Sequence, residues 1–178
     1  ASTAAARIAV TRGANARTRQ GATGGTITLI SRRPEPGPTN QHVGVQTALP
    51  TSEVRGETTG YRADYRISGS KGKWDYLLGA GHEDQGLWVD GECTPIGVDV
   101  TQGDLMSTRA YDLHAKLGYW IDDNQELQFS SNRYRIKSKA EYVPVAGNRD
   151  LGLPTTSVRG TPPGTPAWND AWTTGLSY

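Results

Sequence analysis

The sequence predicts an all-β protein that forms part of a transmembrane antiparallel β-barrel. Two observations lead to this prediction: apolar and polar residues alternate along several segments, and short connections between these segments alternate with long ones. The composition is a third observation, because the 178 residues include 22 Gly, 8 Tyr and 5 Trp but a single Phe. Tyr and Trp are enriched in strands and at membrane interfaces.

The alternation is clearest in segments 61–68 and 111–121, where apolar side chains occupy every second position and polar ones the positions between. A period of two is that of a strand with one buried face. Segments 73–89 and 125–138 show the same pattern less regularly. In the second of these, the apolar positions change phase after Phe129, which predicts a β-bulge near residues 130–132.

The connections add a second signal. Residues 68–73 and 122–124 are short turns rich in Gly, Asp and Asn, whereas 90–106 and about 139–170 are long. Outer-membrane barrels combine tight periplasmic turns with extended extracellular loops in this way. Aromatic residues also gather at two levels, as in the interfacial girdles of such barrels. Near the short turns these are Trp74, Tyr76, Tyr119 and Trp120, and near the opposite ends Tyr61, Trp88, Tyr111 and Trp172.

Alternation alone does not say whether the apolar face meets lipid or a protein core. A self-contained all-β binding domain, soluble or a small membrane barrel, is therefore the alternative. No run approaches the ~18 apolar residues of a membrane helix. The formal net charge of +1 also argues against a general nucleic-acid binder. Residues 1–34 contain six Arg and no acid, but they lack the interleaved aromatics that stack on bases, so no nucleic-acid partner is expected.

The sequence predicts no catalytic residue, no protein metal site and no cofactor, and hence no enzyme. His42, His82 and His114 are far apart, and none has a metal-ligand spacing. The pairs Glu83-Asp84 and Asp90-Glu92 do not fit a calcium loop. The single Cys93 has no nearby His to make it a nucleophile, and no serine-nucleophile motif is present.

The stretch Gly24-Gly25-Thr26-Ile27-Thr28-Leu29-Ile30-Ser31-Arg32-Arg33-Pro34 resembles the end of the plug domain in TonB-dependent outer-membrane receptors of the siderophore-receptor type. There, a glycine pair leads into an apolar strand that ends on Thr or Ser, two basic residues and Pro. Upstream, Ile8 to Gly13 resembles the preceding plug strand with its Arg-Gly pair. The positions that match the plug motif are Arg12, Gly13, Gly21, Gly24, Gly25, Arg32, Arg33 and Pro34.

The resemblance implies a fragment of a larger receptor. Residues 1–40 would form the C-terminal part of the plug domain, and residues 41–178 about the first six strands of an incomplete barrel. The chain departs from the family pattern at Ala14, where Pro is usual, and at Arg19-Gln20, where an apolar-aromatic pair is usual. These departures fall at the plug apex, which faces the ligand in the family.

The function implied by the resemblance is uptake of a scarce ligand, typically a ferric siderophore, across the outer membrane of a Gram-negative bacterium. The implied partners are the TonB energising complex, outer-membrane lipid and the ligand, and iron would arrive as a chelate with the ligand. An anionic chelate favours cationic and aromatic contacts at the outer mouth. By position, the ligand-binding candidates are Arg17, Arg19 and Gln20 in the plug apex and Trp88, Arg149, Arg159 and Trp168 in the loops.

Overall fold

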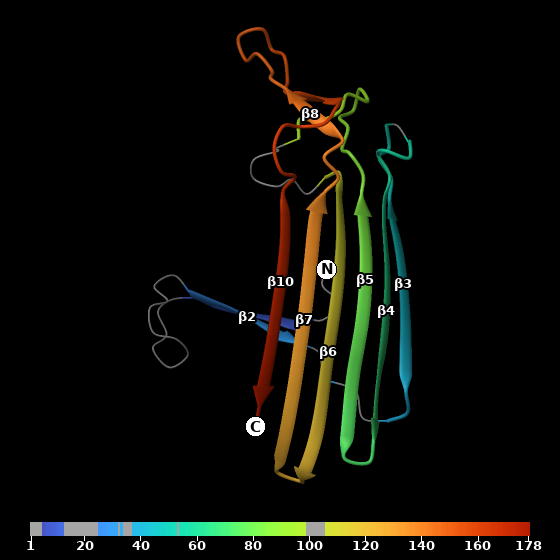
Figure 1. Cartoon of the computed structure of the whole chain (residues 1–178), viewed down its shortest axis with the longest axis vertical. Coiled ribbons are helices and arrows are strands. Elements are labelled where there is room, and N and C mark those ends of the chain that lie inside the picture. Colours follow the sequence, from blue (N-terminus) through green and yellow to red (C-terminus); the bar gives the residue numbers. More distant parts are fainter. Residues whose placement is uncertain (1–4, 13–24, 32, 34–36, 53, 99–105) are drawn as a thin grey trace.

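The computed structural model describes residues 5–12, 25–31, 33, 37–52, 54–98 and 106–178. All regular elements in these residues are strands, which form three antiparallel sheets (Figure 1). No helix in this part of the chain is long and apolar enough to cross a membrane. The all-β fold class predicted from the sequence is therefore confirmed.

The largest sheet has six strands in the order β10-β7-β6-β5-β4-β3. Their bounds are β3 Asn40–Ala48, β4 Gly60–Lys71, β5 Trp74–Gln85, β6 Thr108–Asp122, β7 Gln125–Ser138 and β10 Trp168–Ser177. Each strand from β3 to β6 pairs with the next one along the chain, and β7 pairs with β10, as expected when short and long connections join antiparallel neighbours. Sequence neighbours are thus spatial neighbours, the arrangement found in an up-and-down barrel.

Both short turns fall within the predicted segments, but residues 68–71 of the first segment belong to strand β4. Lys71 pairs with Trp74 across the first, and Gly72 has a φ of 62°. A two-residue hairpin turn of this kind needs positive φ, which glycine adopts without steric cost. At the second turn the backbone N–H of Asn124 donates to Asp122 Oδ1 at 2.9 Å. Both turns lie at the same end of the sheet, at the bottom of Figure 1.

The predicted β-bulge near residues 130–132 is wrong. The pairing of β6 with β7 is continuous from Thr108↔Ser138 to Trp120↔Glu126, and the register shifts only at the turn itself. Phe129 and Arg133 therefore lie on the same face of β7. The apolar pattern changes phase for another reason. Strand β7 continues beyond the apolar part of its outer face, so the outward-facing residues there are charged, and no extra residue is inserted.

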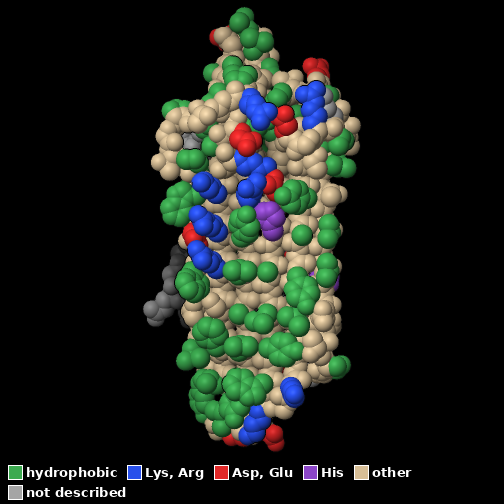
Figure 2. All heavy atoms as spheres, turned by 45° about the vertical axis from the view of Figure 1, so that its right-hand side comes forward, with side chains coloured by type: hydrophobic (Ala, Val, Ile, Leu, Met, Phe, Trp, Pro, Cys, Tyr) green, Lys and Arg blue, Asp and Glu red, His purple; other side chains and the backbone are tan. Residues whose placement is uncertain are grey.

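The six-stranded sheet has two chemically different faces. The outer face carries Tyr65, Ile67, Leu78, Leu117 and Phe129, all at least partly exposed, and Figure 2 shows such side chains gathered over the lower half of the sheet. Trp74 and Tyr119 pack together there, with ring centroids 4.7 Å apart and the ring planes tilted by 48°. Tyr61 and Tyr111 lie on the same face near the other end of their strands, on either side of His82.

On the inner face, polar side chains of one strand lie over glycines of the neighbouring strand. Asp112 lies opposite Gly81 and His114 opposite Gly79, so close that a Cβ on Gly79 would be 2.1 Å from His114 Cε1. Trp120 also points inward, where its indole N–H donates to Asp75 Oδ2 at 3.2 Å. The high glycine content thus has a packing role, because these glycines make room for charged and aromatic groups on the neighbouring strand.

The two smaller sheets are hairpins. Strands β1 (Ala5–Arg12) and β2 (Gly25–Ser31) form one, and β8 (Tyr142–Val145) and β9 (Thr156–Arg159) form the other. In Figure 1 the first runs across the direction of the long strands. Just after β2, Arg33 Nη1 lies 3.3 Å from Glu126 Oε2 of β7, so an ion pair links this segment to the short-turn end of the large sheet.

Candidate functional site

Three connections meet at the end of the sheet opposite the short turns (Figure 1). They join β3 to β4, β5 to β6 and β7 to β10, and the last contains the β8–β9 hairpin. We call their described residues 49–52, 54–59, 86–98, 106–107 and 139–167 the loop cluster. Loops held by a rigid sheet are the usual place for binding residues, so the cluster is the candidate functional site.

The second and third connections are joined through β9. Ile96 forms an isolated bridge with Thr156, and the backbone N–H of Gly97 donates to the Thr155 carbonyl at 3.2 Å. The buried hydroxyl of Ser157 donates to the Ile96 carbonyl at 2.7 Å and accepts from the Val98 N–H at 2.8 Å. A small core of Leu87, Val98, Met106 and Tyr142 lies beside these bonds. The two longest loops therefore form one packed unit.

Glu57 ties the first connection to the other two. Its carbonyl accepts from the Leu87 N–H at 2.7 Å, and its carboxylate accepts from the Tyr142 hydroxyl. The other carboxylate oxygen lies 3.7 Å from Arg159 Nη1. Burial and the bond to Glu57 raise the pKa of Tyr142 to about 12, so the phenol stays protonated and donates at neutral pH. Sequence reasoning missed Glu57 and Tyr142, because neither belongs to a motif and their contact spans 85 positions.

The structure places the four predicted loop residues in three different settings. Trp88 lies in the second connection, where its carbonyl accepts from the Ile96 N–H at 2.9 Å. Arg159 ends β9 beside Glu57. Arg149 lies in the turn closed by the Asn148↔Leu153 bridge, in the segment that extends farthest at the top of Figure 1. Trp168 begins β10 and pairs with Lys137, so it belongs to the sheet.

The structure thus brings Trp88 and Arg159 into one packed unit through Ile96 and β9, and leaves Arg149 and Trp168 apart from it. The predicted plug-apex residues Arg17, Arg19 and Gln20 lie outside the described residues, as do Gly13, Gly21, Gly24, Arg32 and Pro34 of the plug motif. Arg12 ends β1, Gly25 begins β2, and Arg33 makes the ion pair described above. The ligand-binding roles of all these residues stay predictions.

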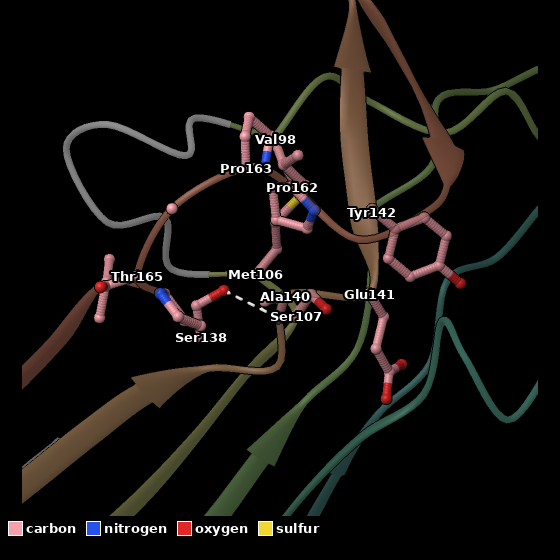
Figure 3. Close-up of a pocket in the computed structure, with 13 residues that line it drawn as sticks. Val98, Met106, Ser107, Ser138, Ala140, Glu141, Tyr142, Pro162, Pro163 and Thr165 are labelled. Atoms are coloured by element: carbon pink, nitrogen blue, oxygen red, sulfur yellow. Dashed lines mark hydrogen bonds between the residues drawn. The ribbon is translucent and has the colours of Figure 1, made fainter.

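A small cavity lies where the third connection folds over the end of the sheet (Figure 3). Val98, Met106 and Tyr142 line it, together with Ser138 and the 162–167 segment. Its volume is about 30 Å³, which is room for one or two water molecules. A chelate or any other ligand of several rings must therefore bind on the surface of the loop cluster rather than in this cavity.

The described residues contain no group of three or more His, Cys, Asp or Glu side chains close enough to hold a metal ion. Among the cationic and aromatic side chains of the loop cluster, Trp88 is 43% exposed and the Arg159 side chain 74%. Such groups recognise anions and ring systems by contact. These exposed groups are what the described part of the site offers to a ligand.

The comparisons agree with this description. No protein-family model matches the chain, and no solved structure matches it. Among curated proteins, the chain is similar to the rhizobactin receptor of Rhizobium meliloti (strain 1021), with 26% identity over 136 residues. The match covers 76% of this chain but 18% of that receptor. This chain therefore spans less than a fifth of the length of the relative.

The class that the fold defines is an all-β protein with one apolar and one polar sheet face and a loop cluster at one end of the sheet. The similarity to a protein named as a rhizobactin receptor makes the class more specific, and it supports the resemblance to a receptor that the plug-like motif indicates. The relative is named as a receptor, the kind of protein that the sequence predicts.

Proposed function

We propose that this chain is part of an outer-membrane TonB-dependent receptor that takes up a ferric siderophore. The observation that carries the proposal is the similarity to a protein named as a rhizobactin receptor, which extends over most of this chain. The plug-like motif near the start and the alternation of short and long connections support the same function. The iron is cargo, held by the siderophore and not by the protein.

The outer face of the sheet supports the membrane location. On β6, the stretch between the aromatic levels at Tyr111 and Tyr119 advances about 27 Å at ~3.4 Å per residue. With the usual strand tilt of ~40°, this corresponds to about 21 Å along the membrane normal, close to the ~25 Å apolar band of outer-membrane barrels. The side chains between these levels on the outer face of β6 are Leu113, Ala115 and Leu117.

The edges of the sheet support a larger barrel. Within the described residues β3 and β10 each pair with one strand only, which leaves a row of backbone groups without a strand partner. Such edges are not tolerated in hydrocarbon. In this proposal residues 41–178 supply about the first six strands, and further strands of the complete receptor cover β3 and β10. Residues 1–40 supply the end of the plug.

The loop cluster is the proposed ligand-binding surface. Trp88 and Arg159 offer an aromatic face and a cation within one packed unit, and Arg149 extends beyond it. By the family resemblance, Arg17, Arg19 and Gln20 would contact the same ligand. The TonB complex would then act on the plug to open a path, as in the family that the chain resembles.

The proposal is tested by deleting the gene that contains this segment and growing the strain under iron limitation on a panel of ferric chelates. We expect growth to fail on one siderophore and to return when the wild-type gene is restored. Radiolabelled iron uptake with that siderophore should fall in parallel. Normal growth on every chelate, together with a defect on a sugar or on cobalamin, would contradict the siderophore and leave a receptor for another ligand.

A further inference from the structure

A polar hollow lies on the inner face of the sheet, at the loop end of β3, β4 and β5, on the upper right of Figure 1. Its volume is about 430 Å³. We call it the inner hollow. Its lining includes two glutamines, Gln46 and Gln85, and the ion pair of Arg62 with Glu83. It is separate from the loop cavity of Figure 3, and none of the loop residues predicted to bind the ligand lines it.

The strand register brings these four side chains together. Gln46 pairs with Arg62, and Arg62 pairs with Glu83, so all three lie on the same face of the sheet. Gln85 follows two positions after Glu83 and therefore lies on this face as well. Its side chain lies over Gly60, where an added Cβ would be 3.2 Å from the Gln85 amide. Glycine at position 60 thus leaves room for this amide beside β4.

Both glutamine amides are available to a ligand. Gln46 is exposed and Gln85 is half-buried, and neither side chain makes a hydrogen bond with a described residue. A glutamine side chain carries one carbonyl acceptor and two N–H donors. The inner hollow therefore offers hydrogen-bond donors and acceptors together, which is what an amide group of a ligand needs, because an amide also both donates and accepts.

The charges beside the amides disfavour an anion. Arg62 Nη1 lies 2.8 Å from Glu83 Oε2. The same guanidinium is 3.5 Å from Asp112 Oδ2 and 3.8 Å from Asp64 Oδ1. Three carboxylates thus surround one cation, and Arg66, the next inner residue on β4, does not line the hollow. An anionic group placed here would be repelled by the remaining negative charge, so the inner hollow suits a neutral group.

We propose that Gln46 and Gln85 bind a neutral, amide-bearing part of the siderophore, while its anionic iron centre stays at the loop cluster. This proposal rests on the function proposed above and narrows the ligand to a siderophore with amide groups. Trp88 is three residues beyond Gln85, at most about 11 Å along the chain, so one ligand can contact both. The volume of about 430 Å³ lies within the usual range of small-molecule sites.

The test measures binding of the ferric siderophore that supports growth in the iron-limitation test to the full-length receptor in detergent. The comparison probes are the same chelate with its amides replaced by esters one at a time, which removes an N–H donor and keeps the shape. At least one ester should bind the wild type about tenfold more weakly, because a hydrogen bond is lost. The Gln46→Leu/Gln85→Leu variant should bind the amide form about tenfold more weakly and that ester equally well. Gln128→Leu, on the same face near the short turns, is the matched control and should bind as the wild type does.

Equal affinity of the double variant and the wild type for the amide form would overturn the proposal, as would an ester penalty of the same size in both proteins. A siderophore without any amide would overturn it too. If the double variant is not recovered from the outer membrane, the two single variants provide the same comparison. The growth test separates this proposal from the previous one. Normal growth of the deletion strain on every chelate removes both, whereas a receptor that is required for uptake but does not need Gln46 and Gln85 for binding removes only the inner hollow.

Discussion

The six-stranded sheet and the loop cluster are built on different principles. In the sheet, every strand is held by a continuous backbone ladder, and side chains alternate between an apolar outer face and a polar inner face. In the loop cluster, two short strands, a core of four residues and a few side-chain bonds around Glu57 hold three connections together. One region repeats a simple rule, and the other depends on individual contacts.

Because of this difference, we expect substitutions in the sheet to act mainly on stability and substitutions in the loop cluster mainly on ligand binding. Substitutions in the sheet act on a surface that would meet lipid in the proposed function or beside the crowded glycines of the inner face, so we expect large effects on stability. Substitutions in the loop cluster remove single contacts, so their effects on stability should be smaller. Their effects on ligand binding should be larger, because the exposed cationic and aromatic groups are there. The variants below test this expectation.

The largest effect is expected for Leu78→Arg, which places a charge on the outer face near the middle of the apolar band. Leu78 is 41% exposed and lies between Ile67 and Ala115. An arginine at this depth should cost about 2–4 kcal/mol in the free energy of unfolding from lipid vesicles. The control is Asn132→Arg, on the exposed inner face opposite His114, which should cost less than about 1 kcal/mol. Equal costs would contradict the assignment of the outer face to lipid.

The next effect tests the crowding of the inner face. Gly79→Ala adds a Cβ that would lie 2.1 Å from His114 Cε1 and should destabilise the protein by about 1–3 kcal/mol. His114→Ala in the same chain should recover part of the loss, as a double-mutant cycle would show. Gly91→Ala is the matched control, since nothing lies within 4 Å of its added Cβ. A Gly79→Ala variant as stable as Gly91→Ala would contradict the packing role of glycine.

Much of the sheet could be predicted from the sequence because its rule is local. The period of two, a short turn within each of the segments 68–73 and 122–124, and the faces of residues 61–68 and 111–121 can all be seen in the sequence. The error at residues 130–132 has the same origin. Alternation identifies the outer face only where that face keeps the same environment along the whole strand. Strand β7 continues beyond the apolar band to Arg133 and Arg135, so the pattern changes there.

The loop cluster could not be predicted in the same way. Its contacts join residues far apart in the chain, such as Glu57 with Tyr142 and Ser157 with Val98, and no periodic sequence pattern predicts them. The sequence identified Trp88 and Arg159 only as exposed, chemically suitable residues. Arg109 and Lys137 likewise become neighbours only through the register of β6 and β7.

A smaller effect is expected for Tyr142→Phe, which removes the hydrogen bond to Glu57. A bond to a charged group contributes about 1.5 kcal/mol or more, so the variant should unfold at a lower urea concentration. Because burial and the Glu57 bond raise the folded pKa of Tyr142 to about 12, above its usual value of 10, the contribution is complete below pH 10. It is lost as the pH rises from about 10 to 12. If the difference in stability between the wild type and the variant stayed the same at pH 12, this role of Tyr142 would be contradicted.

The smallest effect on stability is expected for Arg159→Gln. This variant should show most clearly that the loop cluster acts on ligand binding and the sheet on stability. The Arg159 side chain is 74% exposed and its pair with Glu57 is 3.7 Å long. An exposed pair contributes at most a fraction of a kcal/mol, so the free energy of unfolding should change by less than about 0.5 kcal/mol. If Arg159 contacts the anionic ligand, affinity for the siderophore identified by the growth test should nevertheless fall about tenfold, because an Arg–carboxylate bond is charge-assisted. Lys71→Gln, at the opposite end of the sheet, should change neither quantity. A variant that loses stability but keeps its affinity would instead assign Arg159 to the scaffold of the loop cluster, with Glu57 and Tyr142.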